Sequence, residues 1–460
     1  MTTTPLRSVN GVFQTSSTES CSSSVRFDCI SEGKLLNMSN EGPVFGRSPA
    51  RIPRGVVPLL AACVLLLLGC ELGIDRQPLS GLVQDTLTAE GRMVQLGALW
   101  AGDWPRLDLL GVDTLLSPVS EAPAVGRMGH LAFGEDQDLV LVDEMSQEVW
   151  LREAHSARWT LLTQQGGGPT EIGYAGGLWW EGDTISIYDS RASRLLRLTE
   201  DGSAVGPGIR LAQPSRTETR AALGPVRGGI LLVTTGMPDI TALPGEQRPL
   251  RTLVRVGITD GTSISWDTIG VWKGKRWAVL ANGYGPVPFS PDAFLAARGE
   301  HVVACDGGVP EVMELSVARG AVTRLSWVDP PRPAESLKAA FIERSLEQVP
   351  PEGRPTVRAI LESMQMPDSL PAVGSVLAGL SSVWVARWFG TDLEYPEQAW
   401  PPTEWRWIGL ASPVSVRALD LPSGMLPVEA VDDSTLLVLL RDDMAREGVG
   451  IAHLRPSNHD

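Results

Sequence analysis

The chain has 460 residues, of which 43% are hydrophobic, and a formal charge of −15 at pH 7. This length and apolar content are sufficient for a large packed core. The acidic excess disfavours nucleic acids and anionic lipid surfaces as partners. The 48 glycines and 35 prolines follow no collagen-like period, which favours many short strands joined by turns.

Residues 51–69 have the features of an export signal. Arg51 and Arg54 precede an uncharged apolar run from Val56 to Leu68. The run is shorter than the roughly 20 residues that span a bilayer, but it is long enough for a signal-peptide core. It ends in Leu67-Leu68-Gly69-Cys70, which resembles the lipobox of bacterial lipoproteins. The resemblance implies cleavage before Cys70 and a diacylglyceryl group on its thiol; an uncleaved anchor helix is the alternative.

The residues around this signal show no strand or helix pattern. Residues 1–50 are rich in Ser and Thr and predict either a disordered extension or a stretch that precedes the true start of the protein. Residues 70–92 are polar and predict a flexible tether. We therefore expect a protein of the bacterial cell envelope, anchored to a membrane by lipid at Cys70, on the periplasmic side or at the cell surface.

Processing would leave a more acidic chain with few cysteines. Residues 1–69 contain six basic and four acidic residues, so their removal changes the formal charge from −15 to −17. Cys70 and Cys305 are the two cysteines of the remaining chain. Acylation of Cys70 would exclude an intrachain disulfide, so we expect stability to come from packing.

A strand pattern repeats through residues 93–460. Six apolar runs, several ending in an acid, lie at residues 138–143, 184–189, 229–233, 301–306, 382–388 and 434–442. A shorter segment precedes each run, one further strand follows it, and most repeats have a fourth. The first three runs are spaced by about 45 residues, which is the length of a four-stranded propeller blade, and longer gaps imply insertions. We predict an all-β, six-bladed β-propeller; a seven-bladed ring is the alternative.

The last repeat ends soon after its third strand. We expect Met93–Trp100 to supply the fourth strand, which would close the ring through the N-terminal part of the chain and remove an exposed sheet edge.

The second repeat, Gly166–Gly202, carries a family resemblance. Its segments GGGPTEIG and DTISIYDSRASRLLRLTEDG resemble the six-bladed propellers related to the NHL repeat, many of which are predicted bacterial lipoproteins. Thr170 and Ile172 depart from the usual glycine and phenylalanine of the turn. The resemblance implies the fold and leaves the function open, because propellers support many unrelated activities.

One stretch, residues 333–366, departs from the strand pattern. Ser336–Val349 and Thr356–Met364 have helical spacing, and prolines and a glycine separate them. We predict a helical hairpin inserted between the fourth and fifth repeats. It would either cover one mouth of the ring or pack on the outside of neighbouring blades.

No catalytic motif or metal-ligand spacing is present, and we expect neither a metal nor a cofactor. His130 is the one histidine at the start of a predicted channel-lining strand, so it is a candidate ligand contact; an ordinary polar residue at a strand end is the alternative. Asp143, Asp189, Asp306 and Asp442 end predicted strands. We expect their carboxylates to accept backbone N–H groups of the following turns.

Tryptophan is concentrated in the fifth repeat. Trp400, Trp405 and Trp407 are candidates for stacking on a sugar or a peptide side chain, and Trp400 is the one expected to be exposed. The indoles of Trp405 and Trp407 should share one face of a strand, with Arg406 on the other. Filling the space between blades is the alternative role for all three.

The sequence favours a non-catalytic protein- or glycan-binding module on a membrane-anchored propeller. The alternative is a divalent-metal-dependent propeller hydrolase or lactonase with its site in the central channel. Enzymatic activity is thus uncertain and less favoured than binding.

Overall fold

The computed structural model describes residues 83–457, apart from residues 119–122, 135, 212–217, 237, 240–244, 260–261, 281–282, 348 and 391–398. The predicted extension, the signal peptide and Cys70 lie outside these residues. The described residues form seven β-sheets and two helices.

The first three large sheets each contain four antiparallel strands. Sheet 1 consists of β4 (Met128–Phe133), β5 (Leu139–Asp143), β6 (Val149–Arg152) and β7 (Trp159–Thr163). Sheet 2 consists of β8 (Ala175–Glu181), β9 (Thr184–Asp189), β10 (Arg194–Leu198) and β11 (Ile209–Arg210). Sheet 3 consists of β12 (Glu218–Val226), β13 (Gly229–Gly236), β15 (Leu250–Thr259) and β16 (Thr262–Lys273).

The other large sheets include strands from the N-terminal part of the described chain. Sheet 4 contains β19 (Ala293–Arg298), β20 (His301–Asp306), β21 (Glu311–Ser316), β22 (Ala321–Ser326), β2 (Gly91–Gln95) and β1 (Gln84–Thr88). Sheet 5 contains β23 (Ser375–Ala378), β24 (Ser382–Ala386), β25 (Thr403–Gly409) and β26 (Ser415–Leu421). Sheet 6 contains β27 (Met425–Ala430), β28 (Thr435–Arg441), β29 (Glu447–Pro456) and β3 (Leu107–Leu116).

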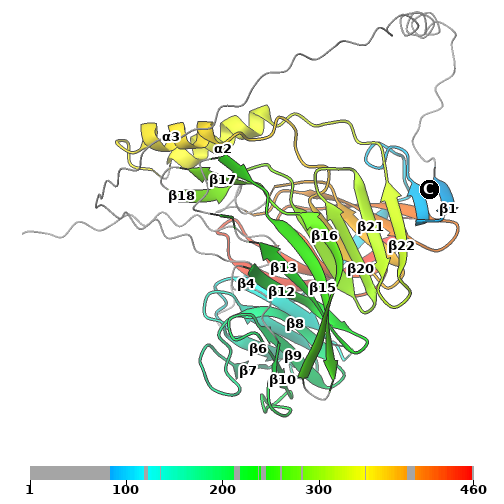
Figure 1. Ribbon diagram of the computed structural model, residues 1–460, viewed down its shortest axis with the longest axis vertical. Helices are drawn as coiled ribbons and strands as arrows, with labels where there is room; N and C mark the ends of the chain where they lie inside the picture. The colour runs from blue at the N-terminus through cyan, green and yellow to red at the C-terminus, as the bar shows by residue number, and fades with distance from the viewer. Residues whose placement is uncertain are drawn as a thin grey trace, which may run out of the picture.

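A smaller accessory sheet and a helical hairpin are inserted between these sheets. The accessory sheet consists of β14 (Gly245–Gln247), β17 (Trp277–Leu280) and β18 (Gly283–Pro286). The hairpin consists of α2 (Glu335–Glu347) and α3 (Arg354–Ser363), within the predicted insertion at 333–366. In Figure 1 the hairpin lies at one end of the molecule, close to β17 and β18.

The predicted repeat is confirmed in its strand order. Each of the six apolar runs forms the second strand of its sheet: β5, β9, β13, β20, β24 and β28. Every residue of β5 is buried, because Val140 and Val142 pack against sheet 2 while Leu139 and Leu141 face the opposite side. A strand covered on both faces has no polar face, which explains the continuous apolar run.

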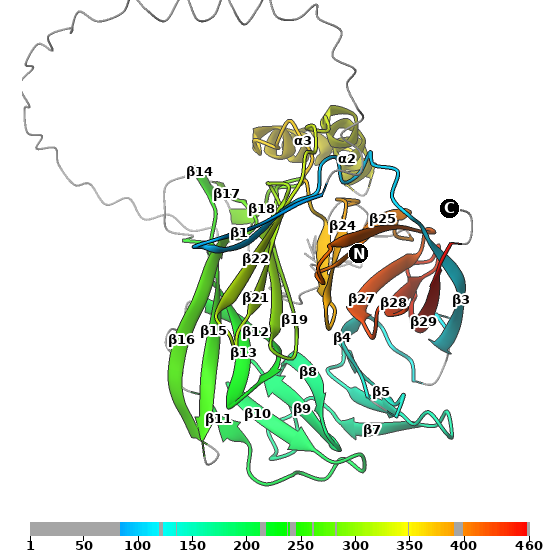
Figure 2. The ribbon, with the colours of Figure 1, turned by 90° about the vertical axis from the view of Figure 1, so that its right-hand side faces the viewer.

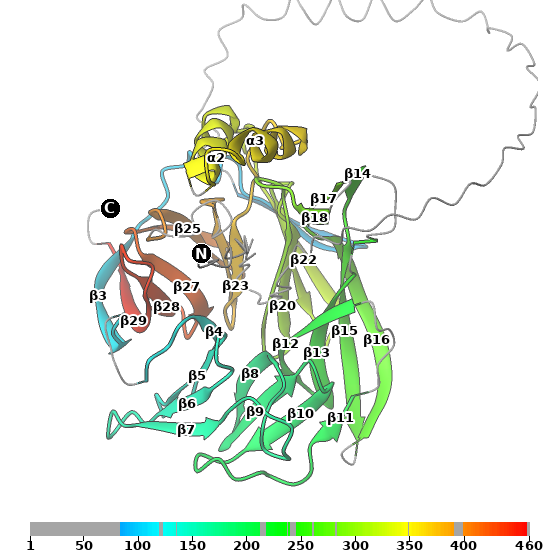
Figure 3. The ribbon, with the colours of Figure 1, turned by 90° about the vertical axis from the view of Figure 1, so that its left-hand side faces the viewer.

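Apolar clusters fill the space between successive sheets. Separate clusters join sheets 1 and 2, sheets 2 and 3, sheets 3 and 4, and sheets 4 and 5, and the largest contains residues of sheets 5, 6 and 1. In Figures 2 and 3 the sheets lie around a common centre, with β4, β8 and β27 near it and β7, β16 and β3 farther out. This arrangement is consistent with an all-β fold of the propeller type.

The prediction for the fourth strand of sheet 6 was wrong. That strand is β3, which pairs antiparallel with β29, for example Ile451 with Asp113. Part of the predicted segment, Met93–Trp100, forms β2. This strand pairs in parallel with β22, at the end of sheet 4 that lies farthest from β19. The segment is apolar because Val94, Leu96 and Leu99 are fully buried against sheets 4 and 5, and not because it belongs to sheet 6.

The predicted tether at 70–92 also needs correction at its C-terminal end. Residues 84–88 form β1 and pair with β2 in a hairpin. All five residues of β1 are exposed, so the hairpin offered no apolar pattern in the sequence.

The helical hairpin packs against the irregular segments that precede β19 and follow β24. Phe341 of α2 and Leu361 of α3 are buried with Phe289 and Trp388. The Phe289 ring contacts Phe341 at a centroid distance of 5.7 Å and Trp388 at 5.8 Å. Neither helix contributes a residue to the central cavity described below, so packing is the role that the contacts support. Neither helix of the described residues is long and apolar enough to cross a membrane.

Candidate ligand cavity

The first strands of the six large sheets surround a cavity of about 700 Å³. Its walls include residues of β4, β8, β12, β19, β23 and β27. Successive first strands contact one another from β4 through β27. A concave site of this volume is typical of sites for small molecules.

Aromatic and proline side chains line part of this cavity. Trp277, from the accessory sheet, is partly exposed and packs its indole against Tyr284 at a centroid distance of 5.7 Å. Trp388 and Phe389 follow β24 and line the cavity as well. Pro238, Pro249 and Pro286 add further apolar surface to the lining, and Pro286 pairs with Trp277 in the accessory sheet. Of the three aromatic residues, Trp277 and Phe389 are partly exposed and offer flat apolar faces to a ligand, whereas Trp388 is 7% exposed and packs against Phe289.

The cavity also has charged walls. Four acidic residues line it: Glu144, Asp292, Glu429 and Glu447. The cationic residues in its lining are Arg127, Arg251, Lys275 and Arg298.

Glu429 lies in the cavity wall, and its side chain is 36% exposed. Desolvation by the surrounding walls raises the pKa of its carboxyl, while Arg298, 3.5 Å away, acts in the opposite direction. Arg298 also donates to the Ala430 and Val431 carbonyl oxygens, which fixes its guanidinium beside the end of β27.

The structure places His130 on the cavity wall and partly exposed. Burial lowers the pKa of the imidazole to about 4, against the opposing effect of a hydrogen bond with the Ala175 backbone. His130 is therefore a neutral group at physiological pH, able to exchange hydrogen bonds with a ligand without adding charge.

Trp400 also lines the cavity, although only 5% of it is exposed. The Arg441 guanidinium lies over its ring, 4.6 Å from the centroid. Trp400 was expected to be the exposed member of the group. Its indole instead packs between the Arg441 guanidinium and the apolar cluster of sheet 6. The Gly424 N–H donates to the Trp400 carbonyl oxygen and so fixes the backbone at this position.

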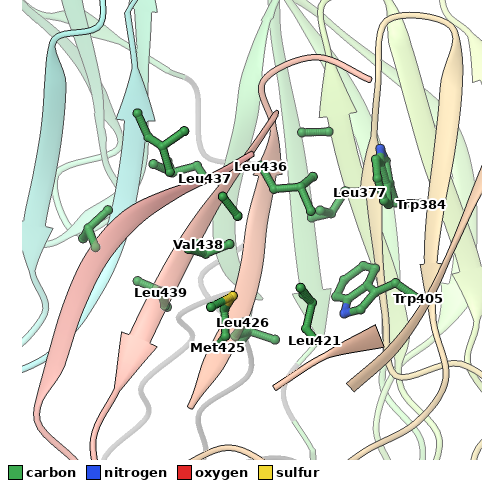
Figure 4. Close-up of a cluster of buried hydrophobic side chains, with 14 of the residues drawn as sticks. Leu377, Trp384, Trp405, Leu421, Met425, Leu426, Leu436, Leu437, Val438 and Leu439 are labelled. Carbon is green, nitrogen blue, oxygen red and sulfur yellow. The ribbon is translucent and has the colours of Figure 1, made fainter. Parts of the chain in front are cut away.

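Trp405 and Trp407 lie away from the cavity, in the cluster between sheets 5 and 6. Trp405 is fully buried and its indole N–H donates to Thr403 Oγ1 at 3.0 Å. Trp407 is 7% exposed and donates to Asp433 at 3.2 Å. Figure 4 shows Trp405 with Trp384 and Leu421 in this cluster. Their burial matches the alternative role of filling space between sheets.

The alternation predicted for this strand is confirmed. Trp405 and Trp407 share one face of β25, while the Arg406 side chain turns the other way and donates to the Leu99 carbonyl oxygen at 3.1 Å. Arg406 also lies over the Trp100 ring at 4.9 Å.

The predicted role of the strand-end aspartates is confirmed too. Asp143, Asp189, Asp306 and Asp442 each accept a backbone N–H from the turn that follows, at 2.9–3.2 Å. In these four sheets the carboxylate thus stabilises the turn that follows the second strand. Among the described residues, no three His, Cys, Asp or Glu side chains are grouped so that they could hold a metal ion.

Sequence reasoning missed Lys275, Trp277 and Trp388. Trp277 and Lys275 belong to the irregular stretch between β16 and β19, which interrupts the repeat. Trp388 ends the apolar run at 382–388, where nothing distinguished a cavity wall from a core position. The one available signal was that Lys275 and Trp277 lie in a stretch that interrupts the repeat.

No family model matches this sequence, and no curated protein sequence does. Similar solved structures include a protein of Bacteroides fragilis whose name marks it as a candidate for export, with 12% identity, a TM-score of 0.45, and coverage of 80% of this chain and 100% of that one. A DUF4221 family member from Bacteroides vulgatus has 10% identity and a TM-score of 0.44 over 77% of this chain and 100% of its own. Virginiamycin B lyase from Staphylococcus aureus has 9% identity and a TM-score of 0.36 over 75% and 99%. These likenesses are too weak to support a fold or an activity, so the fold rests on the strand topology.

Proposed function

We propose that this protein is a six-bladed β-propeller, lipid-anchored in the bacterial cell envelope, whose central cavity binds a glycan without converting it. The observation that carries the proposal is the cavity of about 700 Å³, whose walls combine aromatic faces with charged and polar groups from the inner strands. Small-molecule sites combine concave shape, apolar walls and a few polar groups in this way.

The blade count and the closure of the ring are supported by the strand pairing. Six sheets have four or more strands, and their first strands line one cavity. Sheet 6 combines three strands from the end of the chain with β3 from its N-terminal part. The Met128 N–H at the start of sheet 1 donates to Glu447 of sheet 6 at 2.7 Å. These contacts would join the last blade to the first and leave no open edge between them.

A glycan fits the cavity better than a protein partner. Stable protein interfaces typically bury about 800 Å² on each partner over a broad surface. The partly exposed aromatic residues found here instead line a concave space, with Trp277 on the accessory sheet and Phe389 next to sheet 5. Indole faces can stack on the apolar faces of sugar rings, while neighbouring polar groups bind hydroxyls.

Replacement of Trp277 by Ala tests the cavity as the binding site. We expect the dissociation constant for the best ligand on a glycan array to rise about 10- to 30-fold, because one aromatic wall is removed. Isothermal titration calorimetry on the purified full-length protein measures the change.

Trp159→Ala is the matched control, because Trp159 is a partly exposed tryptophan on β7 that does not line the cavity. We expect it to leave the affinity unchanged. Equal loss in both variants would argue against this cavity, and an array without any bound glycan would refute the proposed function.

The lipid anchor is tested separately by metabolic labelling with a radioactive fatty acid. We expect Cys70→Ala to abolish labelling of the protein, because the thiol that would carry the lipid is gone. Cys305→Ala should remain labelled, since Cys305 is buried between sheets 4 and 5. Persistent labelling of the Cys70 variant would rule out this anchor.

A further inference from the structure

Each acidic residue that the structure describes in the cavity wall is paired with an arginine. The pairs are Arg127–Glu144 at 3.1 Å, Arg251–Asp292 at 2.9 Å, Arg298–Glu429 at 3.5 Å and Arg441–Glu447 at 2.9 Å. The acids therefore neutralise the arginines, and neither set is left to determine the charge of a ligand.

Lys275 is the remaining charged residue among those that the structure describes in the cavity wall. Within the described part of the chain, no ion pair or hydrogen bond engages its ammonium group. Its side chain is partly exposed, and it lies between β16 and β17. Among the described residues the cavity thus has one cation, Lys275, without an acidic partner.

The backbone on both sides of Lys275 is fixed. The Gly274 N–H donates to the Pro249 carbonyl oxygen at 2.8 Å, and the Arg276 N–H donates to Ser290 Oγ at 3.3 Å. A side chain at Gly274 would have its Cβ 2.9 Å from the Pro249 oxygen, so the close approach of these segments requires glycine there. Lys275 is therefore presented from an ordered segment, two residues before the aromatic wall formed by Trp277.

We propose that Lys275 binds a carboxylate of the ligand, and that the ligand is consequently an acidic, uronate-containing oligosaccharide. This inference rests on the proposed glycan-binding function and names its ligand class. A lysine ammonium is a compact point charge that suits a single carboxylate. Phosphate groups are more often bound by several cationic or backbone donors at once, and here the neighbouring Arg251 is occupied by Asp292.

An acidic sugar also fits the order of groups along the wall. Lys275 would bind the carboxylate while Trp277 contacts a ring face. Two residues of the same segment would then recognise the charge and the ring of one sugar. A peptide rich in Asp or Glu would bring several negative charges into the cavity, where the described arginines are already paired with acids and Lys275 is left to receive them.

The test uses a panel of uronate-containing oligosaccharides, each in its acid form and as its methyl ester. The ester keeps the ring and linkage but removes the charge. Binding to the purified full-length protein is measured for the wild type, Lys275→Gln and Lys273→Gln. Lys273 is the matched control, because it is an exposed lysine two residues away that does not line the cavity.

We expect the wild type to bind at least one acid about 10- to 100-fold more tightly than its ester, the range of a hydrogen bond to a charged group. Lys275→Gln should bind the acid and the ester equally, and Lys273→Gln should keep the wild-type preference. The acid preference should also weaken at high salt. Circular dichroism of the three proteins verifies that each is folded.

The outcomes separate this inference from the proposed function. Binding of neutral glycans or esters without preference for acids would overturn the role of Lys275 and leave glycan binding intact. If Lys275→Gln still binds the acid more tightly than its ester, the role of Lys275 is likewise overturned and glycan binding is left intact. Tighter binding of an acidic peptide, or no glycan binding at all, would overturn both.

Discussion

Replacement of Trp405 by Ala should lower the free energy of unfolding by about 3–5 kcal/mol. The indole is fully buried in the cluster between sheets 5 and 6, together with Trp384, Leu419 and Leu421. Truncation would remove its apolar contacts and leave a cavity that the surrounding strands can close only in part. Urea denaturation followed by far-ultraviolet circular dichroism measures the loss, and this signal depends little on the tryptophan itself.

Two control variants define what the Trp405 result means. Trp405→Phe keeps an aromatic ring and should cost less than Trp405→Ala, because less volume is lost. Leu380 lies just before β24 and is 63% exposed. Leu380→Ala should therefore change the free energy of unfolding by at most about 0.5 kcal/mol. A loss below about 1 kcal/mol for Trp405→Ala would mean that the indole does not pack as described.

This cluster illustrates which parts of the fold could be predicted from the sequence. The second strands are continuous apolar runs because neighbouring sheets cover both of their faces, as β5 shows. Their recurrence, the aspartate after several of them and the helical spacing of the insertion led to the correct strand order. Each of these signals is local, so a single sequence is enough to reveal it.

Outer strands carry a weaker signal, which explains the error at sheet 6. Only Leu107 and Leu116, at the two ends of β3, are buried, because this strand is the edge of its sheet. Met93–Trp100 has the stronger apolar pattern, but its burial comes from crossing between sheets 4 and 5. Composition alone could not distinguish these two causes of burial.

The candidate site was predicted less well than the fold. His130 was found because it was predicted to lie at the start of a first strand; it lies within β4, and first strands line the cavity. Lys275 and Trp277 lie in an irregular insertion that only the folded chain brings to the same cavity. The alternation of side chains along a strand correctly predicted that Trp405 and Trp407 share one face. It could not predict whether that face contacts solvent or another sheet.

Loss of the Arg441 charge should be among the most destabilising single changes outside the apolar core. Arg441 pairs with Glu447 at 2.9 Å, and their side chains are 6% and 4% exposed. Arg441→Met would leave the Glu447 carboxylate buried without its cation, which typically costs about 3–5 kcal/mol. Urea denaturation measures the change in the free energy of unfolding.

The same hairpin supplies a matched control. Arg446 pairs with Asp442 at 2.6 Å, but the Arg446 side chain is 53% exposed. Because water and salt screen such a pair, Arg446→Met should cost no more than about 1 kcal/mol. Equal losses for the two arginines would contradict the importance of burial.

A double variant separates the pair from the packing of its members. Arg441→Met combined with Glu447→Leu removes both charges, so it should cost less than the sum of the single replacements. Some loss should remain, because Glu447 also accepts the Met128 N–H at 2.7 Å and Arg441 covers Trp400. The Met128 contact joins sheet 6 to sheet 1, so the remaining loss combines the contribution of this junction with that of the Arg441–Trp400 contact. Additive effects of the two replacements would show that the ion pair itself contributes nothing to that junction.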